Sequence, residues 1–158
     1  MSSNKLDSAE YRRALGCFAT GVAVITAVDE NGAPVGITVN SFNSVSLDPP
    51  LVLWSIADNA GSYETFLAVE HFSVNVLAFD QQDVCERFAK SGTDKFDGLE
   101  CTTGIAGVPL LPEYSAAFVC EREHIYEGGD HKIIVGRVLE FEDRKTDPLI
   151  FYRGHFLK

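Results

Sequence analysis

The chain has 158 residues, a length that predicts one domain able to bury a hydrophobic core of its own. Its formal net charge of -10 argues against a nucleic-acid partner, because a phosphate backbone is bound by a basic surface. No apolar run approaches the roughly 20 residues of a membrane-spanning helix, so no membrane partner is expected either.

The N-terminus and the cysteines indicate the compartment. The opening segment MSSNKLDSAEYRRAL has neither the apolar stretch nor the small-residue cleavage site of a signal peptide. Residues 1–8 are expected to be a flexible segment ahead of the domain. The cysteines lack CxxC or zinc spacing, and we expect them to be reduced core residues rather than nucleophiles: Cys17, Cys85, Cys101 and Cys120. These features predict a cytoplasmic protein.

The first predicted element is a helix over residues 8–19, whose first turn Ser8 can cap. A β-rich segment over residues 22–28 follows it. The Asn31-Gly32 pair is typical of a hairpin turn, so a second strand is expected over residues 34–42.

Residues 50–57 are apolar on both faces and predict a buried strand. A short helix is expected over residues 60–71, followed by another strand over residues 71–79. Asp80 is expected to open a third helix over residues 80–92.

Residues 91–111 are rich in glycine and polar side chains and predict a loop. Two long antiparallel strands, over residues 114–129 and 130–143, are expected to meet at Gly128-Gly129, and a last strand covers residues 148–158. Helices are too few for a repeated strand–helix–strand fold. The sequence therefore predicts a mainly β fold, an antiparallel and nearly closed barrel with short flanking helices.

A run of small hydrogen-bonding side chains separates two of the apolar strands: Thr38, Asn40, Ser41, Asn43, Ser44 and Ser46. A flat heteroaromatic ligand such as a flavin needs donors of this kind along its edge, beside an apolar floor. A solvated turn is the alternative interpretation. The run is longer than the about two to five residues of an ordinary hairpin turn, and it retains Val39, Phe42 and Val45.

Two further segments carry candidate chemistry. In EGGDHKIIVGRV, His131 begins a strand beside a turn and can contact a carboxamide or a phosphate, or it is simply an exposed turn histidine. In YRGHF, Arg153 can hold a phosphate or pair with a surface carboxylate. His124 and His131 flank a hairpin turn without a third ligand, so no metal site is predicted. The sequence contains no GxSxG, GxGxxG or Walker motif.

Seven segments occur in the same order in a known family: RRALGCFATGVAVITA, GITVNSFNSVSLDPPLVLWSI, FSVNVLAFDQQDVCERFA, DKFDG, GVPLL, EGGDHKIIVGRV and PLIFYRGHF. From about residue 12 to residue 156 the chain resembles the short-chain flavin reductases, the small reductase partners of two-component flavin monooxygenases. The resemblance implies an FMN-binding split barrel that spans residues 1–158 as one domain and forms a homodimer.

The resemblance also implies a reaction in which NADH or NADPH reduces FMN or FAD, and the reduced flavin passes to a partner monooxygenase. Hydride moves between the two cofactors, so no side chain need act as acid or base. Since the surface is acidic, attraction of an anionic nucleotide must be local, from Lys90, Lys95, Lys132 or Arg153. A flavin-binding carrier or sensor, and an interaction module without cofactor, remain the alternatives.

By resemblance, the flavin is expected to lie against Thr38, Val39, Asn40, Ser41, Phe42, Ser44, Val45, Ser55, Ile56, Asn59, Ser62, Phe88, Ala89 and Lys90. The nicotinamide nucleotide is expected to contact His131, Tyr152, Arg153, Gly154 and His155. Among these, His131 is the predicted catalytic residue, as the contact of the nicotinamide.

Overall fold

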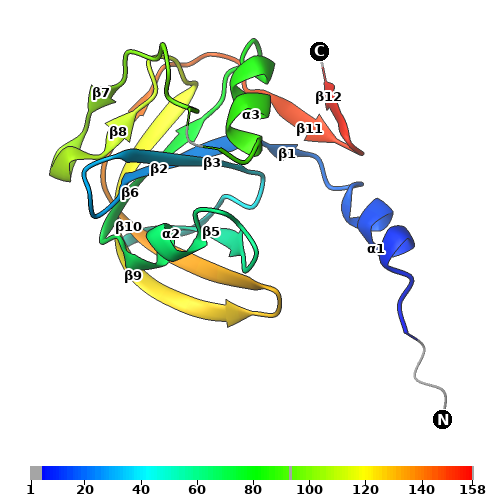
Figure 1. The fold of residues 1–158 in the computed structure, drawn as a ribbon. Helices are drawn as coiled ribbons and strands as arrows, with labels where there is room; N and C mark the ends of the chain where they lie inside the picture. Colours follow the sequence, from blue (N-terminus) through cyan, green and yellow to red (C-terminus); the bar gives the residue numbers. More distant parts are fainter. Residues whose placement is uncertain (1–4, 93, 158) are drawn as a thin grey trace.

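The structure is a computed structural model that describes residues 5–92 and 94–157. The fold is mainly β, with antiparallel sheets and few helices (Figure 1). The helices are α1 (Ser8–Leu15), α2 (Tyr63–Ala68), α3 (Gln82–Ala89) and the 3-10 turn η1 (Ile105–Gly107). The strands are β1 (Thr20–Gly21), β2 (Ala23–Val28), β3 (Pro34–Val39), β4 (Asn43–Leu47), β5 (Pro50–Ala57), β6 (His71–Val76), β7 (Thr102–Thr103), β8 (Pro109–Leu110), β9 (Ala116–Gly128), β10 (His131–Asp143), β11 (Ile150–Tyr152) and β12 (His155–Leu157).

The main sheet has seven strands in the order β3-β2-β6-β9-β10-β5-β4, and every neighbouring pair is antiparallel. A smaller sheet, β1-β11-β12, joins the two ends of the chain. The main sheet is built on hairpins because β2 and β3, β4 and β5, and β9 and β10 are consecutive partners.

Two groups of apolar side chains form the core. In the first, the Trp54 ring meets Phe66 of α2 and Phe72 of β6 edge-on, with centroids 5.1 and 5.8 Å apart. In the second, Phe88 of α3 packs with Leu77 and other buried side chains on the opposite side of β2. Alternate residues of β2 point into the two groups, so almost all of that strand is buried.

A buried polar network crosses the sheet near β8. The hydroxyl groups of Thr26 and Ser73 form a hydrogen bond with each other, and the carbonyl oxygen of Pro109, 2.6 and 2.9 Å from the two hydroxyl oxygens, accepts from the hydroxyl that does not donate within the pair. Asn75 Oδ1 accepts from the backbone N–H of Leu111 at 3.0 Å. Because these side chains are fully buried, each hydrogen bond avoids the free-energy cost of a buried polar group without a partner.

Several predicted boundaries are wrong. Asp7, not Ser8, caps α1, since Asp7 Oδ1 accepts from the N–H groups of Ala9 and Glu10 at 2.9 Å. The helix ends at Leu15 instead of continuing to residue 19. Asp80 does not cap α3, which begins after Gln81.

The run of small polar side chains between the two apolar strands is in part a strand itself. Residues 43–47 form β4, which pairs with β5 from Asn43 opposite Leu53 to Leu47 opposite Pro50. β4 is an edge strand that is mostly exposed, so it lacks the apolar alternation by which strands are predicted. The predicted loop over residues 91–111 likewise contains β7 and β8, and the last predicted strand is a hairpin that turns at Arg153 and Gly154.

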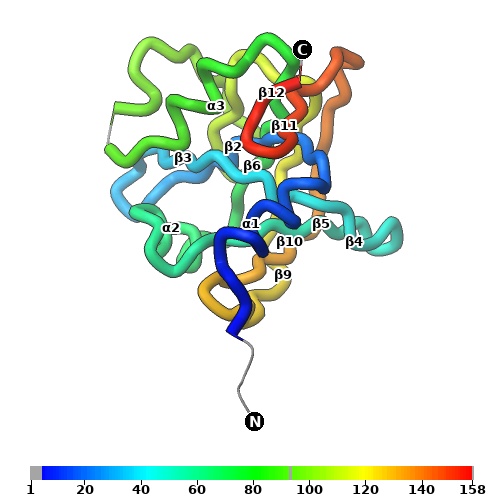
Figure 2. The backbone as a smooth tube through the Cα atoms, turned by 90° about the vertical axis from the view of Figure 1, so that its right-hand side faces the viewer, coloured from blue at the N-terminus to red at the C-terminus, as the bar shows by residue number. Residues whose placement is uncertain are grey.

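The helix α1 stands apart from both cores. It has no buried residue, and Figure 1 shows it outside the sheets, beyond β1. The apolar side chains that predicted the helix, Leu15 and Phe18 among them, are exposed to 57% and 76%. Figure 2, turned by 90°, shows the turn between β4 and β5 as a second projection. Of the predicted flexible segment, residues 1–4 lie outside the described residues.

No helix in the described part of the chain is long and apolar enough to cross a membrane. Within the same residues, His, Cys, Asp and Glu side chains form no group of three with the spacing of a metal site.

Candidate functional site

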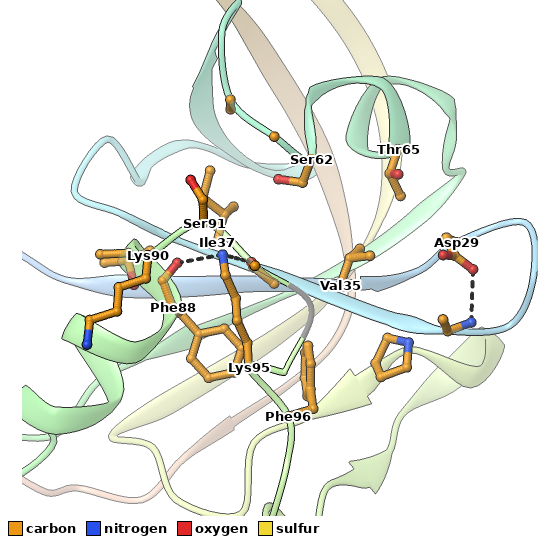
Figure 3. Close-up of a pocket in the computed structure, with 18 of the residues that line it drawn as sticks. Asp29, Val35, Ile37, Ser62, Thr65, Phe88, Lys90, Ser91, Lys95 and Phe96 are labelled. Atoms are coloured by element: carbon orange, nitrogen blue, oxygen red, sulfur yellow. Dashed lines mark hydrogen bonds between the residues drawn. The ribbon is translucent and has the colours of Figure 1, made fainter.

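A cavity of about 650 Å³ opens beside β3, between the start of α2 and the end of α3 (Figure 3). We call it the β3–α3 cavity. It is lined by Asp29, residues 33–38 of β3 and its approach, residues 59–62 and Thr65 around α2, and residues 88–92, Lys95 and Phe96 after α3. Backbone, small polar and apolar groups therefore meet in one place.

The apolar wall depends on close contact between β3 and two aromatic rings. A Cβ atom added at Gly36 would lie 2.7 Å from ring atoms of Phe88 and 3.2 Å from Phe96. The two rings meet edge-on, with centroids 5.0 Å apart. Only glycine fits at this position of β3 without displacing the rings.

Two side chains fasten α3 and the segment after it to β3. Thr38 Oγ1 donates to the carbonyl oxygen of Cys85 at 2.7 Å. Lys95 Nζ donates to the carbonyl oxygens of Gly36, at 3.1 Å, and Phe88, at 3.0 Å (Figure 3). Burial lowers the pKa of Lys95, because it removes water from the charged form.

The turn before β10 lies next to the loop that lines the cavity. His131 pairs with Ala57 across the β10–β5 ladder, and the N–H of Asp58 donates to the carbonyl oxygen of Asp130 at 2.9 Å. The Nδ1 atom of His131 lies 2.6 Å from Asp130 Oδ1. This hydrogen bond lowers the pKa of Asp130 and orients the imidazole, leaving Nε2 for another partner.

A lysine adds a second link between β10 and the cavity loop. Lys132 Nζ lies 3.1 Å from Glu127 Oε2 and 3.2 Å from Asp58 Oδ1, and 5.7 Å from the centre of the Tyr63 ring. Hydrogen bonds raise the pKa of Lys132, and the bond to Glu127 has a larger effect than the bond to Asp58. The segment from Asp58 to Tyr63 is thus held at both ends by β10.

The C-terminal hairpin lies against the end of α1. The N–H of Arg153 donates to the carbonyl oxygen of Gly16 at 3.0 Å, and its guanidinium contacts Tyr152 Oη at 2.8 Å and Cys17 Sγ at 2.9 Å. None of the residues from Tyr152 to His155 lines the β3–α3 cavity.

Comparison with known proteins identifies the family. The profile described as "Flavin reductase like domain" matches residues 15–158 of the chain. The chain belongs to the flavin reductase-like family. The family expected from the sequence motifs is therefore confirmed.

Curated and solved relatives agree. The FMN reductase (NADH) SmoA of Agrobacterium fabrum is 47% identical over 150 residues, which are 95% of this chain and 85% of that protein. The reductase subunit HsaB of a flavin-dependent monooxygenase from Rhodococcus jostii is 39% identical over 157 residues, 99% of this chain and 80% of that protein.

A solved structure of the NADH:FAD oxidoreductase SgcE6 of Streptomyces globisporus, in complex with NAD and FAD fragments, has a TM-score of 0.90. It is 36% identical and covers 96% of this chain and 92% of that one. Some matched proteins are longer. The chain spans 50% of one protein of Rhizobium meliloti and 54% of one solved chain from Sinorhizobium meliloti.

In this flavin reductase-like chain, the structure brings part of the predicted flavin set together. The predicted residues that line the β3–α3 cavity are Thr38, Asn59, Ser62, Phe88, Ala89 and Lys90. They come from three separate segments, the end of β3, the start of α2 and the end of α3. The cavity therefore unites positions that are up to about 50 residues apart in the chain.

The other predicted flavin residues lie outside the lining. The side chains of Val39 and Ile56 are buried in the first core group, and Phe42 packs against Phe118. Ser41 Oγ accepts from the N–H of Ser55 at 2.9 Å. The residues Asn40, Ser44 and Val45 are exposed.

The residues expected to contact the flavin do not include the middle of β3, Thr65 or the residues that follow Lys90, although Lys95 is expected to attract an anionic nucleotide. Among these are Gly36, Lys95 and Phe96, which build the wall and its polar fastening. The sequence signal was present in the segment DKFDG, where a lysine precedes an aromatic residue. That pattern does not reveal that both side chains turn back to β3.

Proposed function

We propose that the chain is the reductase component of a two-component flavin monooxygenase, and that it reduces a flavin bound in the β3–α3 cavity with NADH or NADPH. One observation carries the proposal. A single cavity unites Thr38, Asn59, Ser62 and residues 88–90, which the family resemblance assigns to the flavin. The class of reaction agrees with the relatives named FMN reductase (NADH) and NADH:FAD oxidoreductase.

The residues fit a flavin. The volume of about 650 Å³ lies within the roughly 300–1,000 Å³ of small-molecule sites. Apolar groups of β3 and the aromatic residues packed on it line one side of the cavity, and Asn59 and Ser62 offer hydrogen-bonding groups on another. A bound flavin supplies the chemistry itself, by accepting hydride from a reduced nicotinamide.

The protein's contribution is binding and orientation. Backbone N–H groups and small side chains around the cavity hold the flavin edge, where charge increases on reduction. We propose that His131, oriented by Asp130, contacts the carboxamide of the nicotinamide, because the Asp58–Asp130 hydrogen bond keeps its turn beside the cavity loop. Two rings held in this way react as one complex rather than by chance encounter.

We also propose that residues 1–158 act as one domain whose main sheet curls into the split barrel of the family. The contact between Ser41, after β3, and Ser55 of β5 supports this, because it links two strands from opposite halves of the sheet. The exposed apolar side chains Leu15 and Phe18 support a homodimer, in which a second copy covers α1. A cytoplasmic location remains a prediction from the sequence.

One experiment tests the function. The purified protein is examined for a flavin spectrum, and loss of NADH is followed at about 340 nm with and without added FMN or FAD. NADH oxidation that requires added flavin supports the proposal. A permanently yellow protein that leaves NADH unchanged contradicts it and favours a flavin carrier, while a colourless and inert protein favours an interaction module.

The identity of the preferred flavin and that of the protein that receives it are tested separately. Relatives are named for FMN as well as for FAD, so the assay is run with both flavins and with NADH and NADPH. The relative HsaB is named as the reductase subunit of a flavin-dependent monooxygenase, which supports a monooxygenase as the recipient of the reduced flavin.

A further inference from the structure

Lys95 is unusual among the partly buried lysines because its partners carry no charge. Its ammonium donates to two backbone carbonyl oxygens, of Gly36 and Phe88. Within residues 5–92 and 94–157, no carboxylate forms an ion pair with it. Lys132 is the contrasting case, since two carboxylates neutralise it.

The pKa directions follow this difference. Burial lowers the pKa of Lys95, whereas hydrogen bonds to Glu127 and Asp58 raise that of Lys132. A cation that is desolvated without a counter-charge is costly, and an anion placed beside it removes the cost. Because Lys95 lines the β3–α3 cavity, the missing counter-charge can come from a ligand.

The other charged groups of the cavity do not replace this counter-charge. Asp29 Oδ1 already accepts from the N–H groups of Asn31 and Ala33, both at 2.9 Å, which commits it to the turn before β3. Lys90 has the same sign as Lys95 and adds to the positive potential of the cavity. An ammonium has three N–H donors, so one remains beyond the two carbonyls that hold Lys95.

We propose that Lys95 is a ligand-binding residue whose third N–H holds an anionic oxygen of the flavin, while its other two bonds keep α3 against β3. The inference rests on the proposed function, because it takes the flavin as the occupant of the cavity. Two parts of the ligand supply an anionic oxygen. One is the phosphate, and the other is the carbonyl edge of the ring, which becomes electron-rich on reduction.

The test measures flavin affinity without NADH. Trp54 is the single tryptophan of the chain and is buried against Phe66 of α2, so its fluorescence reports a flavin bound beside that helix. Dissociation constants are measured for oxidised FMN, for FMN reduced chemically under anaerobic conditions, and for riboflavin, which lacks the phosphate. The variants are Lys95→Met, which removes the charge, and Lys95→Arg, which keeps it.

We expect Lys95→Met to raise the dissociation constant of at least one FMN form by about tenfold, the usual scale for a lost charge-assisted hydrogen bond. Lys95→Arg is expected to raise the dissociation constant of FMN much less. If the phosphate is the partner, Lys95→Met weakens the binding of FMN but not that of riboflavin. If the ring is the partner, Lys95→Met weakens the binding of reduced FMN more than that of oxidised FMN, and it weakens the binding of riboflavin as well.

The control is Lys145→Met, which makes the same change of charge at an exposed residue outside the cavity and should leave all three constants unchanged. If Lys95→Met fails to fold, Lys95→Gln keeps N–H donors without the charge and carries the same expectation. An equal loss for all three ligands, or a Lys95→Arg protein as weak as Lys95→Met, overturns the inference, because Lys95 would then only hold the wall.

The inference and the proposed function fail in different ways. Wild-type protein that binds FMN through Lys95 but does not oxidise NADH leaves the inference standing and contradicts the reductase. Wild-type protein that reduces FMN with NADH, while Lys95→Met binds every flavin as well as wild type does, overturns the inference alone.

Discussion

The backbone N–H of Asp58 donates to the carbonyl oxygen of Asp130 at 2.9 Å. This bond joins the loop that lines the β3–α3 cavity to the turn that carries His131. A hydride donor bound at His131 and a flavin bound in the cavity would therefore be held by adjoining segments of backbone rather than by two independent loops.

His131 is predicted to contribute more to nicotinamide binding than to flavin binding. We expect His131→Ala to raise the KM for NADH about tenfold and to change the dissociation constant of FMN much less, since the imidazole lies outside the cavity lining. Steady-state kinetics and a flavin titration measure the two effects. The matched control, His124→Ala, removes an exposed imidazole from the same hairpin. Equal loss of both affinities would contradict the assigned role.

Lys132 is predicted to position the cavity loop. Lys132→Met removes the contacts to Glu127 and Asp58, and we expect the KM for flavin to rise about two- to fivefold, the scale of a partly exposed ion pair. A double-mutant cycle with Asp58→Asn measures the coupling. If the two changes are simply additive in their effect on KM, the pair does not position the loop.

Gly36 is predicted to be intolerant of a side chain. Gly36→Ala places a Cβ atom 2.7 Å from the Phe88 ring, and we expect a loss of about 1–3 kcal/mol in the free energy of unfolding together with weaker flavin binding. Denaturant unfolding and flavin titration check this. Gly21→Ala is the control, because a Cβ there meets nothing within 4 Å. A Gly36→Ala protein as stable as wild type would show that the rings move aside at little cost.

The pH dependence of stability is predicted to carry the signature of Lys95. Because burial lowers its pKa, the folded protein without ligand releases this proton at a lower pH than the unfolded chain, whose lysine titrates near ~10.4. Between these two values the unfolded chain binds more protons, so wild type should gain stability relative to Lys95→Met as pH rises toward ~10.4. Denaturant unfolding at several alkaline pH values measures this. If the difference in the free energy of unfolding between wild type and Lys95→Met stays constant, or changes in favour of the variant as pH rises, the prediction is wrong.

The homodimer is predicted to depend on α1 and the turn that follows it. Phe18→Asp and Leu15→Asp place charges on side chains that are 76% and 57% exposed in the single chain, so they should dissociate the dimer without unfolding the subunit. Sedimentation velocity and circular dichroism separate these outcomes. Ile105→Asp, at an exposed apolar residue of η1, is the control. A protein that stays dimeric after both changes would place the interface elsewhere.

Local signals explain which parts of the fold could be predicted. Asn31-Gly32 and Gly128-Gly129 mark the turns of two hairpins that the structure contains, and the mainly β, antiparallel class followed from them. The sequence does not predict β4, because an exposed edge strand pairs on one side only and needs no apolar face. The sequence predicts too late an end for α1, because Phe18 continues the helical spacing beyond Gly16, although the chain turns there toward β1.

The site was predictable only where a residue stands inside a family motif. The expected family is confirmed, and the expected flavin-reducing activity agrees with the names of the relatives, whereas the individual site residues remain predictions. Lys95 illustrates the difficulty. Its position in the cavity is set by hydrogen bonds to the backbone carbonyl oxygens of Gly36 and Phe88. Gly36 is far from Lys95 in the chain, and any residue type carries a backbone carbonyl, so neither partner is visible in the sequence. Such contacts depend on how α3 docks on β3, and local spacing does not encode that.

The buried network of Thr26, Ser73 and Asn75 fixes where the segment after α3 returns to the main sheet. Its hydrogen bonds hold Pro109 and Leu111 on the sheet, so the long segment after α3 is anchored at its C-terminal end by buried polar groups. β7 pairs with β8 and is held to the sheet through the same network, whereas the exposed residues around Gly98 lie ahead of this anchored part. A change of length in this segment is therefore better tolerated at that exposed turn than within residues 102–111.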